Sequence, residues 1–229
     1  MQLPVYTYPT LTVLIDDSES FLKSLSFQLD PMLASKTFHD TNSALSWLTN
    51  SARLDTIPLR ANFDTQNLPL DQCNVAVDIE RIWRISGQDQ RFATPSVLVV
   101  DYSMPQMNGI EFLQALKHLP CKKILFTGAA DEKIAVNAFN RGLIDRYIKK
   151  SDEDALDLLE REIVDLQATF FAQQSETLRD LLVLHNYTFL SDPALADVVL
   201  QLSRAHGFVE RLVVSRLRAR LSGDVDGAV

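Results

Sequence analysis

Residues 96–113 read SVLVVDYSMPQMNGIEFL, and this stretch decides the fold. The run from Ser96 to Val100 is short, largely β-branched and bounded by Pro95 and Asp101, which predicts a strand buried on both faces. A Met-Pro turn, an Asn-Gly pair and an amphipathic helical pattern follow it. A carboxylate at the carboxyl end of such a strand opens into the crevice where doubly wound sheets bind ligands. Asp101 is therefore predicted to carry chemistry.

Three further apolar runs in the first 150 residues also end in polar side chains. They are residues 11–15 followed by Asp16 and Asp17, 123–126 followed by Thr127, and 146–148 followed by Lys149 and Lys150. If all are parallel strands, three carboxylates converge at one edge, and each pair about 4 Å apart costs about 4 kcal/mol at an effective dielectric of 20. A divalent cation would relieve this repulsion. Oxygen ligands with room for water favour Mg²⁺ over Zn²⁺, which prefers His and Cys.

Taken together, these residues resemble the receiver domains of two-component response regulators. The resemblance runs from about Thr10 to Ser151 and rests on five elements in order: VLIDD, DYSMPQMNG, the hydroxyl in ILFTG, Tyr147, and Lys150 three residues later. It implies an α/β fold, with a flavodoxin-like doubly wound parallel sheet of five strands. It also implies a sensor histidine kinase or a phosphotransfer protein as the partner.

The resemblance assigns a role to each strand-end residue. Asp101 would be the phosphoacceptor, and Asp16 and Asp17 would hold Mg²⁺ together with Asp101 and the backbone carbonyl of Ser103. An aspartyl nucleophile attacks a phosphoryl group in line, and catalysis is then mostly positioning and charge neutralisation. The site would act as a switch, because the new phosphoryl charge attracts neighbouring donors.

The remaining roles concern the phosphoryl oxygens, which Thr127 and Lys150 would bind, and the switch aromatic, which would be Tyr147. Lys149 competes with Lys150 for the same role. Counting from Tyr147 favours Lys150, whereas the spacing from Thr127 leaves a one-residue ambiguity. Each residue also has a plainer interpretation, since an Asp after a strand often only caps a helix and an aromatic in a strand is usually core packing.

The sequence departs from the receiver pattern in two places. Ser151 stands where receivers usually have a proline. A long insertion at about residues 51–95 precedes the phosphoacceptor strand, and its segment CNVAVDIERIWRI suggests an extra strand that runs into a short helix. We interpret the insertion as a surface elaboration, with a partner surface as the alternative. Its predicted packing residues are Leu68, Val75, Val77, Ile79 and Trp83.

Three successive segments are predicted: a receiver domain over 1–150, a long helix over 151–186 and a small α+β region over 187–229. The helix has an apolar seam with alternating three- and four-residue spacing, made by Leu156, Leu159, Ile163, Leu166 and Phe170. Such spacing is typical of a coiled coil, so we expect a homodimer through residues 152–185. A helix packed on its own domain would show a similar pattern.

The C-terminal region carries weaker signals. Asp192 and Pro193 predict a helix start and Gly207 a helix end. From Phe208 the pattern has period two, as on a half-buried strand, and residues 222–227 suggest a turn. Arginines at 216, 218 and 220 alternate with Leu217, Ala219 and Leu221. No helix-turn-helix, cyclase or phosphodiesterase motif is present.

Composition narrows the class of protein. A net charge of -8 argues against a general nucleic-acid binder, which normally carries a basic footprint. No stretch approaches the roughly 20 apolar residues of a membrane span, and the N-terminus lacks the regions of a signal peptide. Cys73 and Cys121 have no metal or redox spacing. We therefore expect a cytoplasmic protein.

Three functions remain open. The first is a response regulator of a two-component phosphorelay that signals through protein contacts. The second is a scaffold with a receiver fold that works without phosphorylation. The third is an aspartyl phosphohydrolase of the haloacid dehalogenase type. That family requires a second Asp two residues after the nucleophile, where this chain has Ser103.

Overall fold

The computed structural model describes residues 4–51, 89–128, 132–184, 188–215 and 218–223. The chain forms two compact units. One, the five-stranded unit, comprises 10–55 and 92–170, and the other, the three-stranded unit, comprises 1–9, 56–91 and 171–229. Most of the predicted insertion lies outside the described residues, including its extra strand and helix, its five packing residues and Cys73.

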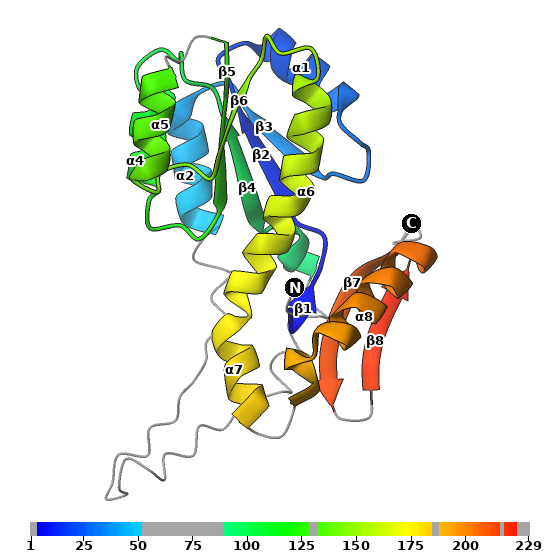
Figure 1. The fold of residues 1–229 in the computed structure, drawn as a ribbon. Helices are drawn as coiled ribbons and strands as arrows, with labels where there is room; N and C mark the ends of the chain where they lie inside the picture. Colours follow the sequence, from blue (N-terminus) through cyan, green and yellow to red (C-terminus); the bar gives the residue numbers. More distant parts are fainter. Residues whose placement is uncertain (1–3, 52–88, 129–131, 185–187, 216–217, 224–229) are drawn as a thin grey trace, which may run out of the picture. The chain divides into compact units, whose positions relative to one another are not determined.

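The five-stranded unit is built on a parallel sheet of the predicted type (Figure 1). The strands are β2 (Leu11–Ile15), β3 (Ser35–Phe38), β4 (Pro95–Val100), β5 (Lys122–Thr127) and β6 (Arg146–Lys149). Their order is β3-β2-β4-β5-β6, and each neighbouring pair is parallel. The flavodoxin-like prediction is confirmed, and the order reverses between β2 and β4, where such sheets bind ligands.

Helices cover both faces of this sheet (Figure 1). On one face lie α2 (Thr41–Ser51), α4 (Gly109–Ala115) and α5 (Glu132–Asn140), and on the other lie α1 (Glu19–Gln28) and α6 (Ala155–Gln174). Strand β4 supplies both cores, because alternate side chains of a strand point to opposite faces. Leu98 and Val100 belong to the first core, and Val97 and Val99 belong to the second.

Helix α6 differs from the long coiled-coil helix that the seam predicts. Leu159, Ile163 and Leu166 are at most 2% exposed and belong to the second core, and Phe170 is also buried. The prediction of a dimer seam at these side chains is therefore wrong, because they pack on their own sheet. The three-four spacing fits any helix with an apolar stripe toward a core, so spacing alone did not distinguish the two cases.

The helical stretch is also interrupted after Gln174. Helix α7 (Glu176–Leu184) begins two residues later. Between the two helices, the Ser175 hydroxyl donates to the carbonyl of Phe171 at 2.7 Å and accepts from the backbone N–H of Val5 at 3.3 Å. A serine that bonds the carbonyl four residues earlier often bends a helix.

The three-stranded unit joins the two ends of the chain. Its antiparallel sheet has the order β1-β7-β8, with β1 (Tyr6–Thr7), β7 (Phe208–Ser215) and β8 (Arg218–Gly223). It also contains η3 (Thr188–Ser191) and α8 (Pro193–His206), while η2 (Asp89–Ala93) precedes β4. The division therefore differs from the three successive segments that the sequence predicts.

The start and end of α8 are as predicted. The Asp192 side chain accepts from the N–H of Ala194, and Gly207 ends the helix with a φ of 64°. The predicted strand is present, but as a hairpin, and β8 extends to Gly223 where a turn was expected. Positions 216, 217 and 224–227 lie outside the described residues. Within the described part of the chain, no helix is both long and apolar enough to cross a membrane.

Candidate functional site

Asp101 lies directly after β4, with only 6% of the residue exposed. Its backbone N–H donates to the carbonyl of Ile15 at 2.9 Å, which extends the pairing of β4 with β2 by one residue. Its Oδ2 accepts from the backbone N–H of Ser103 at 2.6 Å. This short turn fixes the carboxylate and leaves Oδ1 to face the neighbouring strand ends.

Lys150 brings the strand ends together. Its Nζ donates to Oδ1 of Asp101 at 2.7 Å and to Oδ2 of Asp16 at 2.5 Å. Its backbone N–H donates to the carbonyl of Thr127 at 3.2 Å, which ties the end of β6 to the end of β5. Lys149 instead pairs with Glu132 on α5. Of the two adjacent lysines, Lys150 is the one whose ammonium reaches the carboxylates.

The two acidic residues after β2, Asp16 and Asp17, differ in burial. Asp16 is 4% exposed, and its Oδ1 accepts from the N–H of Ser18 at 2.9 Å, whereas Asp17 is exposed. No group of three His, Cys, Asp or Glu residues that could hold a metal occurs in the part of the chain that the structure describes. The ammonium of Lys150 lies between Asp16 and Asp101, and its single positive charge offsets one of their two negative charges.

Thr127 and Tyr147 lie on the strands that flank this position. Thr127 ends β5 and is fully buried. Tyr147 pairs with Leu125 across the sheet and is half-buried against the first core. Tyr147 also lines an apolar groove of about 480 Å³, shared with Val136 and Phe139 of α5 among others.

Charge pairing outweighs burial at Lys150. Burial lowers the pKa of this ammonium, but hydrogen bonds and attraction from Asp101 and Asp16 raise it more, so the net shift is upward. A lysine ammonium that stays charged can donate hydrogen bonds to the oxygens of a bound anion. This arrangement suits a phosphoryl group.

Two residues contribute to the site in ways that the sequence did not reveal. A Cβ on Gly109 would lie 2.1 Å from the carbonyl oxygen of Asp101, so only glycine allows α4 to approach the loop after β4 this closely. The Asn-Gly pair signalled a turn but not this contact. The second is Phe21, whose ring lies beside the Lys150 ammonium, and no sequence pattern marks it.

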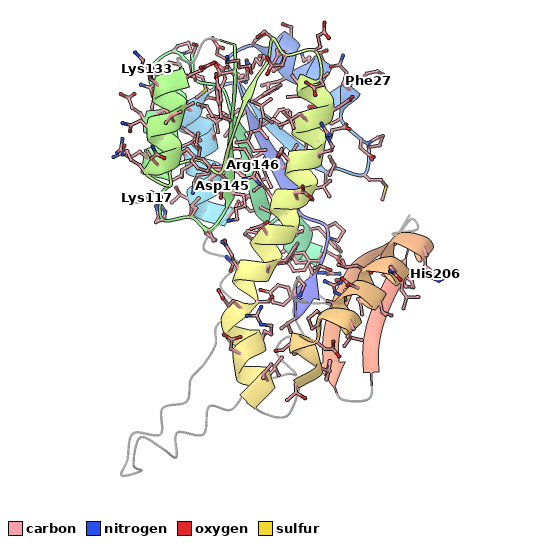
Figure 2. All side chains as sticks on the ribbon, in the orientation of Figure 1. Phe27, Lys117, Lys133, Asp145, Arg146 and His206 are labelled. Carbon is pink, nitrogen blue, oxygen red and sulfur yellow. The ribbon has the colours of Figure 1, made fainter. Side chains whose placement is uncertain are left out.

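A second charged group lies at the amino end of β5 and β6. Asp145 accepts from Lys122 at 3.3 Å, and Arg146 pairs with Glu162 at 2.5 Å. Figure 2 shows Asp145 and Arg146 toward the lower end of the sheet, away from Lys133 at the start of α5. These pairs are separate from the candidate site at the carboxyl ends.

Comparisons of the sequence with a family model and with known proteins indicate the same family. Residues 68–160 match the family model described as the response regulator receiver domain. The chain is 34% identical over 76 residues to regulatory protein AtoC of Escherichia coli, an alignment that covers 32% of this chain and 16% of AtoC. It is 26% identical over 92 residues to transcriptional regulatory protein HptR of Staphylococcus aureus, covering 40% of this chain and 35% of HptR.

A solved structure extends the similarity over nearly the whole chain. The Legionella pneumophila response regulator LqsR aligns with a TM-score of 0.78 and 33% identity, over 96% of this chain and 64% of that one. The chain therefore spans less than two thirds of each of these three relatives. From the matched family model, the sheet and this likeness, we conclude that the chain contains a response regulator receiver domain.

Proposed function

We propose that this chain is a response regulator of a two-component phosphorelay, in which Asp101 accepts a phosphoryl group. One observation carries the proposal. The Lys150 ammonium is held 2.7 Å from Asp101 and 2.5 Å from Asp16, at the carboxyl ends of adjacent parallel strands. Positive charge gathered around a buried aspartate is what phosphoryl transfer to a carboxylate needs.

The chemical step uses few protein groups. A carboxylate oxygen of Asp101 attacks the phosphorus of the donor, and a phosphorus–oxygen bond forms. The bond from phosphorus to the leaving atom breaks, and its electron pair departs with the imidazole nitrogen of a phosphohistidine or the acyl oxygen of a small donor. Lys150 would then turn from Asp101 toward the phosphoryl oxygens, and the Thr127 hydroxyl would donate to them as well.

We propose Mg²⁺ as the cofactor, with Asp16, Asp17, Asp101 and the backbone carbonyl of Ser103 as its protein ligands. The donor set supports this choice, because it is all oxygen and because Asp16 and Asp101 already converge on one cation. When bound, Mg²⁺ supplies charge neutralisation and polarises the transferred group. Lys150 must release Asp16 for this purpose, so the ammonium serves as a counter-ion that the site can exchange.

The output would pass through protein contacts. The phosphoryl group would carry about 1.5 to 2 negative charges, by analogy with other phosphorylated side chains, and would draw Thr127 and Lys150 inward. We propose Tyr147 as the aromatic that responds, because it is half-buried and lines the groove beside α5. The phosphoryl donor would be a sensor histidine kinase or a phosphotransfer protein. We do not propose a dimer through α6, because its seam is packed in the core.

Phosphorylation by acetyl phosphate tests the proposal. Asp101 should take up phosphate only with Mg²⁺, and Asp101→Asn should abolish the uptake. Asp165→Asn, an exposed carboxylate on α6, is the matched control and should label like the unaltered protein. Labelling that persists in Asp101→Asn or in excess chelator would refute the assignment. A protein that never labels but keeps its partner contacts would favour a phosphorylation-independent scaffold.

A further inference from the structure

Phe21 lies one turn into α1, in a position set by the helix cap. The Ser18 hydroxyl accepts from the backbone N–H of Phe21 at 3.3 Å, which fixes the first turn directly after the acidic pair. The ring is partly buried and packs against the second core. Its centroid lies 6.2 Å from that of Phe126, the residue before Thr127, with the two planes inclined by 40°. The two rings form an aromatic wall beside the site.

The Lys150 ammonium faces this wall. Its Nζ is 4.4 Å from the centroid of Phe21 and 6.0 Å from that of Phe126. A lysine ammonium within about 6 Å of an aromatic face is attracted by the negative face of the ring, by roughly 0.5 to 1 kcal/mol at exposed sites and about 2 when desolvated. The Lys150 ammonium therefore contacts Asp16, Asp101 and an aromatic face.

The aromatic contact differs from the other two because nothing in the proposed reaction takes it away. Binding of a cation would occupy Asp16, and phosphorylation would convert Asp101 into an acyl phosphate. The ammonium must change partners at both steps, and a lysine side chain has considerable rotamer freedom to lose or regain. A ring that holds the ammonium throughout keeps it near the incoming phosphoryl oxygens.

We infer that Phe21 is a positioning residue for Lys150, and that its ring retains the ammonium at the site while the ammonium transfers from carboxylate to phosphoryl oxygens. This inference rests on the proposed function. Phe21 touches neither the phosphoryl group nor the metal, and it acts through Lys150 alone. The contribution of the ring to binding of a phosphoryl mimic should therefore vanish when the ammonium is absent.

The test is calorimetric titration of the full chain with beryllofluoride at saturating Mg²⁺. Phe21→Leu keeps an apolar side chain but removes the ring, and it should weaken beryllofluoride binding by about two- to fivefold. Phe21→Tyr should restore it, because tyrosine also presents an aromatic face. Phe27→Leu is the matched control on the same helix (Figure 2), since Phe27 is 91% exposed, and it should bind like the unaltered protein.

A double-mutant cycle separates positioning from packing. In a Lys150→Ala background, Phe21→Leu should cause no further loss. A loss of the same size in that background would overturn the inference, because the ring would then act through packing. Replacing Phe21 by pentafluorophenylalanine adds a second test, since fluorination reverses the charge of the ring face with little change of shape. This replacement should weaken binding at least as much as leucine, and binding unchanged from wild type would also overturn the inference.

The two proposals fail in different ways. If the unaltered protein binds beryllofluoride with Mg²⁺ but Phe21→Leu binds equally well, the inference is wrong and the proposed function stands. If the unaltered protein does not bind beryllofluoride at all, the proposed function fails and the inference falls with it.

Discussion

Two adjacent lysines have different surroundings, and this difference gives the first prediction. Lys150 donates to Asp101 and Asp16, whereas Lys149 is paired with Glu132 near the surface. Lys150→Ala should keep Mg²⁺ binding but weaken beryllofluoride binding tenfold or more, because a hydrogen bond to a charged group contributes about 1.5 to 3 kcal/mol. Lys149→Ala should bind nearly as the unaltered protein does. Titration of both variants with beryllofluoride measures this difference. The reverse result would mean that the register of β6 is shifted by one residue.

Gly109 provides a prediction about stability at the same scale. Gly109→Ala would place a methyl group 2.1 Å from the carbonyl oxygen of Asp101, so either α4 or the loop after β4 must move. We expect a loss of roughly 1 to 3 kcal/mol in the free energy of unfolding, the usual cost of overpacking. Gly128→Ala is the control, since no atom lies within 4 Å of its added Cβ. Urea unfolding of both variants measures the difference, and equal costs would contradict the steric argument.

At the scale of elements, four of the five parallel strands were predictable because each follows from a short apolar run that ends in a polar side chain. Burial of β4 on both faces, with alternate side chains in the two cores, follows directly from that pattern. Strand β3 was not located, because its residues read SKTF and form no apolar run. The fate of α6 was not predictable, because Leu159, Ile163 and Leu166 have a spacing that fits both a coiled coil and a core stripe. Only the packing of α6 on the sheet decides between them. The contact of Phe21 with Lys150 could not be predicted either, because the two residues lie on elements that are far apart in the sequence.

The buried seam of α6 makes a prediction that a dimer seam would not. Ile163→Ala should lower the free energy of unfolding by about 2 to 5 kcal/mol, because it removes a fully buried side chain from the second core. Val164→Ala, one residue along and 52% exposed, should change it by no more than about 0.5 kcal/mol. Both are measured by urea unfolding at several protein concentrations. A midpoint that rises with concentration and is lost in Ile163→Ala would instead indicate a dimer through this helix.

Strand β5 carries a buried lysine that affects stability as a function of pH. Lys123 is 7% exposed, its Nζ donates to the carbonyl of Leu119 at 3.3 Å, and burial lowers its pKa from the ordinary value of 10.5. Between the folded pKa and 10.5, the unfolded chain binds more protons than the folded one, so this group makes stability rise with pH. Lys123→Met should therefore stabilise the protein at pH 7, by about 1 kcal/mol.

The measurement for Lys123 is a comparison of two curves. Unfolding free energies of the unaltered protein and of Lys123→Met should converge as pH rises toward 10.5, because the buried ammonium loses its charge. Lys117→Met, on the loop before β5, is the control for removing a lysine charge, since Lys117 is exposed. A constant difference at every pH would show that Lys123 acts through packing alone.

At the scale of the whole molecule, the two ends of the chain meet in one unit. β1 pairs with β7, so that Thr7 lies opposite Arg211, more than two hundred positions later in the sequence. The side chains of Tyr6 and Tyr8 both pack on Phe171, with ring centroids 6.0 and 4.9 Å away. No local pattern marks a strand of two residues, and its partner is set by tertiary packing. The predicted division into successive segments therefore missed this strand.

The shared sheet predicts that a change near the N-terminus loosens the C-terminal hairpin. Tyr6 is 6% exposed, and Tyr6→Ala removes its edge contact with Phe171 while leaving the β1 backbone in place. Truncation of a buried aromatic typically costs about 3 to 5 kcal/mol. Amides of β7 should therefore exchange with deuterium much faster in Tyr6→Ala. Amides of β4 in the other unit should keep their protection, because Tyr6 belongs to neither of the two cores that β4 supplies.

An exposed side chain of the same unit supplies the control for this last prediction. Val198 lies on α8 and is 50% exposed, so Val198→Ala should change exchange in β7 by no more than about 0.5 kcal/mol. If Tyr6→Ala and Val198→Ala behave alike, β1 contributes nothing to the hairpin. If Tyr6→Ala instead speeds exchange equally in β4 and β7, the two units unfold together. Faster exchange confined to β7 means that β1 stabilises the C-terminal hairpin, while the five-stranded sheet keeps its stability without this contribution.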